Sequence, residues 1–175
     1  TGPAEWSRRH QYELGSMRRV LQIKLREVVR EEESGTYGIG VGASISRWPY
    51  QRFRITIRFG CDPERVEELV QTVITQIDSL KAFGTTDKYV NKVKENQRRS
   101  REVSLKENGF WQNAIQSAYV NGEDLTSILE YDRRVKALTA ETIQETAAKY
   151  FTMNNYAKFV LYPQEGTEAR PPEVE

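Results

Sequence analysis

The stretch YGIGVGASISRWPYQRFRITIRF, residues 37–59, decides the fold class. In its first half, apolar residues alternate with glycines and one serine, which predicts a strand with one apolar and one bare face. In its second half, apolar residues alternate with arginines and a threonine. Residues 47–51 form a turn between the halves, so the two strands are expected to pair antiparallel with one wet face. The bare face leaves room for a closely packed neighbour.

Helices are expected on both sides of this pair of strands. Over residues 6–29, apolar residues recur every three or four positions, which predicts an amphipathic helix. After the strands, Asp62 and Pro63 suit the start of a second helix and Gly84 suits its end. Four further helical stretches are expected over 87–107, 110–120, 125–138 and 139–149.

The C-terminal part reads as one more strand and a tail. Residues 156–162, YAKFVLY, predict a terminal strand ended by Pro163, and the Pro- and Glu-rich residues 164–175 predict a disordered tail. We therefore predict one α+β domain over residues 1–163, with an antiparallel sheet and helices covering mainly one face. Three strands leave a sheet edge that needs cover, so one or more strands are expected to precede Thr1 in a parent protein.

Composition narrows the function classes. Lys and Arg total 26 against 25 Asp and Glu, so the net charge of +1 gives no overall field that favours nucleic acid or an acidic membrane. A basic helix at 88–101 also carries acidic residues and a single aromatic, so a solvated face is favoured over nucleic-acid binding. No apolar run predicts a membrane span. One cysteine, Cys61, excludes an internal disulfide and fits the cytosol and the periplasm equally well.

The sequence offers no catalytic or metal-ligating set. His10 is the only histidine, so neither a zinc site nor an activated Ser34, Ser46 or Cys61 is expected. The acidic run at 31–33 is not expected to bind a metal ion. Neighbouring side chains at the end of a helix point in different directions, so the three carboxylates do not converge on one point. The glycines at 38–42 lie within a strand rather than before a helix, which excludes a dinucleotide-binding turn.

Arg30 and Tyr37 are the candidate substrate-binding residues. Arg30 falls in the last turn of the first helix and Tyr37 begins the next strand, with Gly35 suited to a tight turn between them. A guanidinium and a phenol so placed can both donate to one carbonyl oxygen, and such bonds strengthen as that oxygen gains negative charge. The alternative is that Arg30 caps its own helix and Tyr37 packs in the sheet.

The run VLQIKLREVVREEESGTYGI, residues 20–39, resembles the C-terminal half of insulinase-family (pitrilysin-like, M16) zinc peptidases. There a helix ending Leu-Arg-Glu, a glycine turn and a Tyr-x-Val strand recur in this order. The similarity continues over residues 4–163. It implies a metallohydrolase fold of the LuxS and mitochondrial processing peptidase type. It also implies a non-catalytic domain that helps to close a substrate chamber, because the zinc motif His-x-x-Glu-His of the first half is absent from this chain.

The resemblance also has implications for the cofactor, the partners and the cellular compartment. No cofactor is expected in this segment, and zinc is expected on the N-terminal half of the parent or on a partner chain, with a peptide or protein as substrate. Arg30 and Tyr37 match residues that contact the substrate carbonyl in several members, although Arg26, one turn earlier, could be the arginine that counts. The resemblance suggests a bacterial protein and allows a periplasmic one. The alternative functions are a scaffolding or peptide-binding subunit without a catalytic role and, less favoured, a nucleic-acid-binding protein.

Overall fold

The computed structural model describes residues 1–29 and 36–163. It is an α+β fold in which helix α1 (Arg8–Glu27) is followed by two long strands, β2 (Thr36–Ser46) and β3 (Arg52–Cys61). The other elements are β1 (Gly2–Pro3), the 3-10 turn η2 (Pro63–Arg65), α2 (Val66–Phe83), α3 (Asp87–Ser104), α4 (Asn108–Asn121), the 3-10 segment η3 (Leu125–Glu130), α5 (Tyr131–Ala137) and α6 (Ala140–Tyr150). The class agrees with the sequence prediction.

The sheet of the described chain has the strand order β1-β3-β2. β2 and β3 are antiparallel along their whole length, with Ile39 opposite Phe59 and Ile45 opposite Phe53. The predicted antiparallel hairpin is thereby confirmed. β1 adds a two-residue ladder at the far side of β3, where Gly2 lies opposite Phe53.

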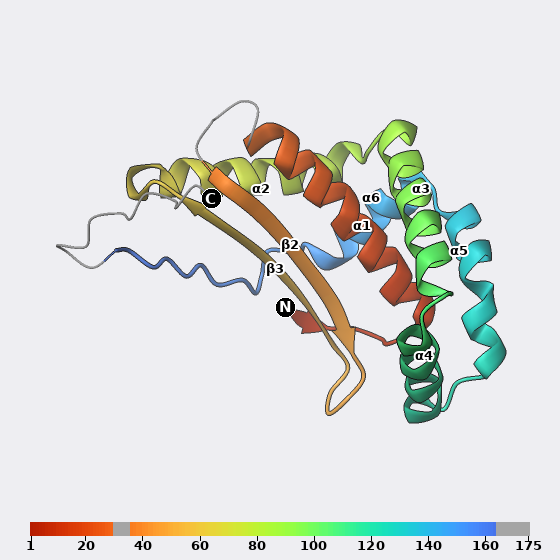
Figure 1. Ribbon diagram of the computed structural model, residues 1–175. Coiled ribbons are helices and arrows are strands. Elements are labelled where there is room, and N and C mark those ends of the chain that lie inside the picture. The colour runs from red at the N-terminus through yellow and green to blue at the C-terminus, as the bar shows by residue number, and fades with distance from the viewer. Residues whose placement is uncertain (30–35, 164–175) are drawn as a thin grey trace, which may run out of the picture.

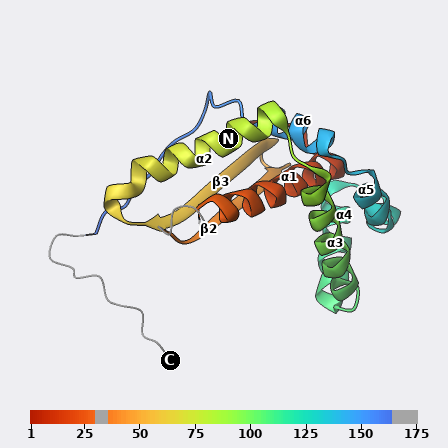
Figure 2. The same cartoon turned by 90° about the horizontal axis from the view of Figure 1, so that it is seen from above.

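Helices α1 and α2 lie side by side over the apolar face of the sheet (Figures 1 and 2). The apolar stripe of α1 is buried there because one face of the helix repeats with the period predicted from the sequence. The opposite face of the sheet is open, since Arg52, Arg54 and Arg58 are exposed. The core is formed mainly by Leu14, Met17, Leu21 and Leu25 of α1, Ile39, Val41 and Ile45 of β2, Phe53 of β3 and Leu69, Ile77 and Leu80 of α2.

The second half of the chain returns to this core through α6. The ring of Tyr150 packs edge-on against Phe53, with ring centroids 5.0 Å apart. Gln144 donates from Nε2 to the carbonyl oxygens of Lys81 (3.2 Å) and Ala82 (2.9 Å) at the end of α2. Gly84 then leaves the helix with φ of 68°, a left-handed conformation that favours glycine.

A buried polar network joins α1 to α3. Gln97 of α3 donates from Nε2 to Ser16 Oγ (2.9 Å) and accepts from Tyr12 Oη (2.8 Å). Ser16 in turn donates to the carbonyl of Tyr12 (2.8 Å). Ser16 and Gln97 are both buried, so these bonds satisfy groups that water does not reach. Burial raises the pKa of Tyr12 to about 12.

The predicted terminal strand is wrong. Residues 156–162 are extended but are not paired with a strand in the described chain, and Phe159 and Leu161 are 89% and 97% exposed. Lys158 of this segment pairs with Glu67 in the first turn of α2. A β-type sequence forms a strand only where its backbone bonds to a neighbouring strand, and the described chain shows no ladder to residues 156–162. The predicted tail, 164–175, lies outside the described residues. Two smaller differences are that residues 125–130 are a 3-10 segment and that α3 ends at Ser104.

Candidate functional site

The candidate substrate-contact site is the junction between α1 and β2. Arg30 lies outside the described residues. The backbone of Tyr37 belongs to β2, at a shift of the ladder between Thr36 and Gly38, but its side chain lies outside the described part. The predicted pairing of these two side chains therefore stays a prediction. The residues flanking the junction are described and show how both ends are held.

Gln22 fixes the register between the end of α1 and the start of β2. Its Nε2 donates to the carbonyl oxygen of Ile39, and its Oε1 accepts from the N–H of Val41, both at 2.6 Å. The amide thus bonds to the outer edge of β2 as a neighbouring strand would. Since Gln22 and Ile39 enclose the junction on either side, this contact sets where the helix ends relative to the strand.

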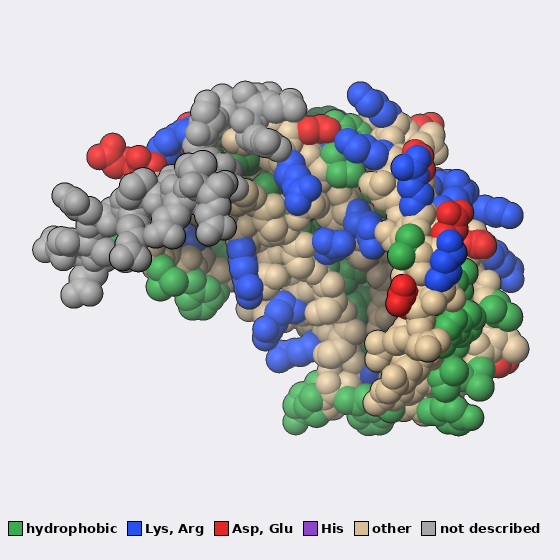
Figure 3. All heavy atoms as spheres, viewed as in Figure 1, with side chains coloured by type: hydrophobic (Ala, Val, Ile, Leu, Met, Phe, Trp, Pro, Cys, Tyr) green, Lys and Arg blue, Asp and Glu red, His purple; other side chains and the backbone are tan. Residues whose placement is uncertain are grey.

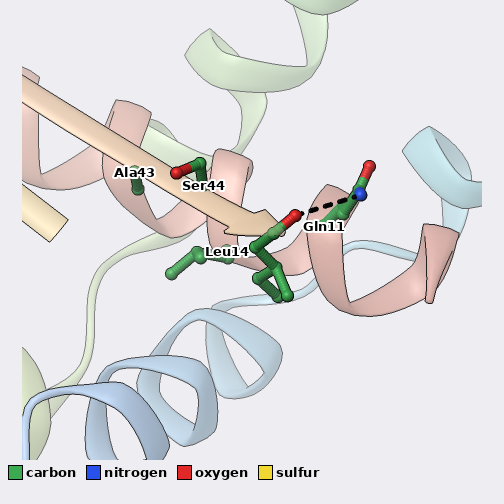
Figure 4. Close-up of a pocket in the computed structure, with 5 residues that line it drawn as sticks. Gln11, Leu14, Ala43 and Ser44 are labelled. Atoms are coloured by element: carbon green, nitrogen blue, oxygen red, sulfur yellow. Dashed lines mark hydrogen bonds between the residues drawn. The ribbon is translucent and has the colours of Figure 1, made fainter. Parts of the chain in front are cut away.

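Two further side chains of α1 continue along the same strand edge. Arg18 donates from Nη1 to the carbonyl of Val41 (3.0 Å), and Gln11 donates from Nε2 to the carbonyl of Ile45 (3.4 Å). Between them lies a cavity of about 250 Å³ lined by Gln11, Leu14, Ala43, Ser44 and Ile45 (Figure 4). The α1 edge contacts, Gln11, Arg18 and Gln22, therefore cover the outer edge of β2 and leave one gap at Ala43.

The last turn of α1 is held from its other side by α3. The Tyr89 hydroxyl donates to Glu27 Oε2 (2.5 Å), and Lys92 lies 3.8 Å from Glu27 Oε1. The Lys24 ammonium lies 5.6 Å from the centre of the Tyr89 ring. Arg26 points into solvent from this turn. The helix end that precedes Arg30 is therefore bonded both to β2, through Gln22, and to α3, through Glu27.

The described residues do not fit a zinc site. They contain no group of three or more His, Cys, Asp or Glu residues that could hold a metal ion. The His10 ring donates from Nδ1 to the Glu5 carbonyl (3.0 Å), and its Nε2 lies 3.4 Å from the Lys149 ammonium. A neighbouring ammonium disfavours a cation at that nitrogen. No chemical step of this chain is therefore derived through a metal.

The basic residues of α3 are partly used inside the fold. Arg101 donates to the Ile128 carbonyl (2.7 Å) and lies over the rings of Phe110 and Tyr131. Lys94 donates to the carbonyl of Lys136, and Arg99 pairs with Glu95. The contacts of Arg101 and Lys94 join α3 to the segments that follow it, whereas the Arg99 pair lies within α3.

Sequence reasoning missed the α1 edge contacts. Gln11, Arg18 and Gln22 are spaced by seven and four residues, so they share one face of α1. A polar stripe beside an apolar one on the helix was the available signal, but such stripes are usually solvated. Their role became visible only when β2 was placed against that face.

The fold and the junction define a class of α+β domain with two helices on one face of an antiparallel sheet and no metal-holding group among the described residues. The family model that matches the chain is the peptidase M16 inactive domain, over residues 1–97. The match covers more than half of the 175 residues, and the chain belongs to this family. The resemblance inferred from residues 20–39 is thereby confirmed.

The relatives of the chain are much longer proteins. A zinc protease PQQL-like protein of Arabidopsis thaliana is 26% identical over 167 residues, which cover 86% of this chain and 18% of that protein. The crystal structure of the periplasmic protease PqqL of Escherichia coli superposes with a TM-score of 0.72 at 21% identity, over 86% of this chain and 16% of that one. The ferredoxin protease FusC, solved in complex with Arabidopsis ferredoxin, gives 0.74 at 19% identity, over 88% and 17%. These structures share the fold.

No helix within the described residues combines the length and apolar character needed to cross a membrane.

Proposed function

We propose that this chain is the non-catalytic part of a zinc metalloendopeptidase, where it closes the substrate chamber and contributes substrate contacts to a zinc site on another domain. The observation that carries the proposal is the match to the peptidase M16 inactive domain, which includes both Arg30 and Tyr37. Zinc proteases among the relatives support the reaction class, and the periplasmic relative supports a periplasmic location. The partner is the zinc-bearing half, on the same or another chain, and the substrate is a peptide or protein.

In this proposal, Arg30 and Tyr37 bind the carbonyl of the peptide bond that is cleaved. A guanidinium N–H and a phenol O–H donate to the carbonyl oxygen, and both bonds tighten as negative charge develops on it. The described contacts of Gln22 and Glu27 hold the two segments that lead into the junction. The described segments on either side of the two donors are thus held before substrate arrives.

The test is the kinetics of Tyr37→Phe and Arg30→Ala in the full-length protein that contains this chain. Loss of one oxyanion donor lowers rates by about 100- to 1000-fold. The metal carries part of the same charge, so we expect kcat to fall by about 10- to 100-fold, with a smaller change in KM. Tyr37→Phe keeps the ring, so the melting temperature should hardly change.

Arg26→Ala is the matched control. Arg26 lies one turn before Arg30 and its side chain is exposed. If Arg30 is the functional arginine, Arg26→Ala should leave kcat within about twofold of the parent enzyme. The reverse pattern would move the role to Arg26. Unchanged turnover in all three folded variants would overturn the substrate-contact role and favour a scaffolding or peptide-binding subunit.

A further inference from the structure

The open face of the sheet carries positive charge without a carboxylate. It consists of five cross-strand pairs of β2 and β3, which we call the glycine face: Gly38 and Gly60, Gly40 and Arg58, Gly42 and Thr56, Ser44 and Arg54, and Ser46 and Arg52. Its three arginines are exposed, and no ion pair to them is found within the described residues. The local charge of +3 contrasts with +1 for the whole chain.

Side chains cover the two strands of this face unequally. Glycines leave the β2 side bare, while Arg54 and Arg58 stand on the β3 side about 13 Å apart along the strand. Figure 3 shows Lys and Arg side chains over the long strands, with no Asp or Glu among them in this view. The surface at the β2 glycines is backbone, so a second chain can approach it more closely than the roughly 10 Å that separates packed sheets.

At two of the glycines, Gly40 and Gly60, the structure leaves room for a larger side chain. A Cβ on Gly42 would lie 2.7 Å from Thr56 Oγ1, so a larger residue there requires the Thr56 side chain to move. A Cβ on Gly40 would find its nearest atom at 3.9 Å, and one on Gly60 would find nothing within 4 Å. Glycine weakens a strand interior relative to alanine. Glycine kept in open space within a strand is typical of a place where another chain comes close.

We propose that the glycine face binds an extended segment of a substrate protein whose carboxylates pair with Arg54 and Arg58. The inference rests on the proposed peptidase function and names the charge class of its substrates. An extended peptide fits because its side chains on one face repeat about every 7 Å, so that alternate ones can reach both arginines. Nucleic acid fits less well, because the ten positions contain no aromatic side chain on which a base could stack.

The experiment measures peptide binding by the full-length protein after its metal is removed with a chelator, so that binding is read without cleavage. The probes are two fluorescent ten-residue peptides, identical except for aspartate or asparagine at alternate positions. We expect the aspartate peptide to bind about 3- to 10-fold more tightly, the range for two partly exposed charge pairs. The difference should shrink at high salt.

Charge reversal at Arg54 and Arg58 together should abolish the preference for aspartate. The matched control is Arg98→Glu with Arg133→Glu, which makes the same charge change at exposed positions of α3 and α5. This control should keep the preference. If both double variants lose it equally, or if a single-stranded oligonucleotide displaces the peptide as well as unlabelled aspartate peptide does, a specific acidic-peptide site on the glycine face is overturned.

Gly40→Val separates a peptide site from an interface with another part of the parent protein. Space is open at Gly40 and valine favours strands, so the melting temperature should hold or rise while affinity for the aspartate peptide falls by about 5-fold or more. A clear fall in melting temperature would show that the face is covered within the protein, and would overturn the proposal. Absence of hydrolysis by the zinc-loaded protein would overturn the proposed function alone, whereas equal affinity for both peptides would overturn this inference alone.

Discussion

The two edges of the sheet differ in whether their backbone N–H and C=O groups have hydrogen-bond partners. At β2, the α1 edge contacts bond to the backbone of Ile39, Val41 and Ile45. At β3, the two residues of β1 and the hydroxyl of Thr1 cover only the end near Phe53, and the stretch from Ile55 onward has no partner strand among residues 1–29 and 36–163. One edge is closed by side chains of a helix, and the other is open to a strand.

Because of this contrast, only one of the two edges can accept a further strand. An edge whose N–H and C=O groups are already bonded cannot add a strand, so α1 blocks pairing at the end of the sheet that leads into the junction. The β3 edge retains the groups that a strand needs. A peptide bound near the junction would therefore lie across a face of the sheet, and any added strand would join at β3.

The largest expected effect is on the closed edge. Gln22→Ala removes both amide bonds and leaves the groups of Ile39 and Val41 without their partner, so we expect the free energy of unfolding to fall by about 1–3 kcal/mol. Urea unfolding measures this change. The control is Gln71→Ala on the exposed side of α2, which should change stability by less than about 0.5 kcal/mol. Equal losses in both variants would show that Gln22 is not a special contact.

Hydrogen exchange compares the two edges directly, because Val41 and Ile57 lie opposite each other in the ladder. The Val41 N–H donates to Gln22 and should exchange at least roughly 10-fold more slowly than the Ile57 N–H in this chain. If strands that precede Thr1 in a parent protein pair with β3, the Ile57 amide should become protected in the longer protein. Slow exchange at both positions in this chain would contradict the open edge.

The smallest expected effect concerns how α1 is held behind the closed edge. The pKa of Tyr12 is raised from 10 to about 12, chiefly by burial, so the folded state holds this proton more tightly than the unfolded state does. Its contribution is complete below pH 10 and is lost as pH rises toward 12. We expect a loss of about 1 kcal/mol, smaller in Tyr12→Phe. Melting curves between pH 9 and 11.5 test this. Tyr131 and Tyr150 also have raised pKa values, so part of the slope should remain in the variant.

The elements whose apolar residues repeat with the period of a strand or a helix were predictable. The alternation over residues 37–59 predicted the antiparallel hairpin, and the stripe of α1 predicted the helix, because each pattern matches one repeating geometry. Residues 156–162 carry a strand pattern too, but a strand is completed by ladder hydrogen bonds to a neighbour, and the described chain forms none to this segment. Local sequence therefore predicted extended backbone and overstated pairing.

The candidate site was predictable only in part. The resemblance pointed to Arg30 and Tyr37, whose side chains lie outside the described residues, so their roles stay predictions. The contacts that hold the junction could not be read from the sequence, since Gln22 bonds to a strand whose position depends on tertiary packing. The alternating pattern predicted that the three arginines of β3 face solvent. Only the strand register of the structure shows that glycines of β2 lie beside them.

The Gln144 contact bears on where the chain can be truncated. The family model ends at residue 97, yet the carbonyl oxygens of Lys81 and Ala82 receive their hydrogen bonds from α6, about fifty residues further on. A fragment cut at residue 97 would lose these donors, the ring of Tyr150 against Phe53 and the buried side chains of Ile143 and Ala147. The limit of recognisable sequence similarity is therefore not a place where the chain can be shortened, and truncation studies should keep α6.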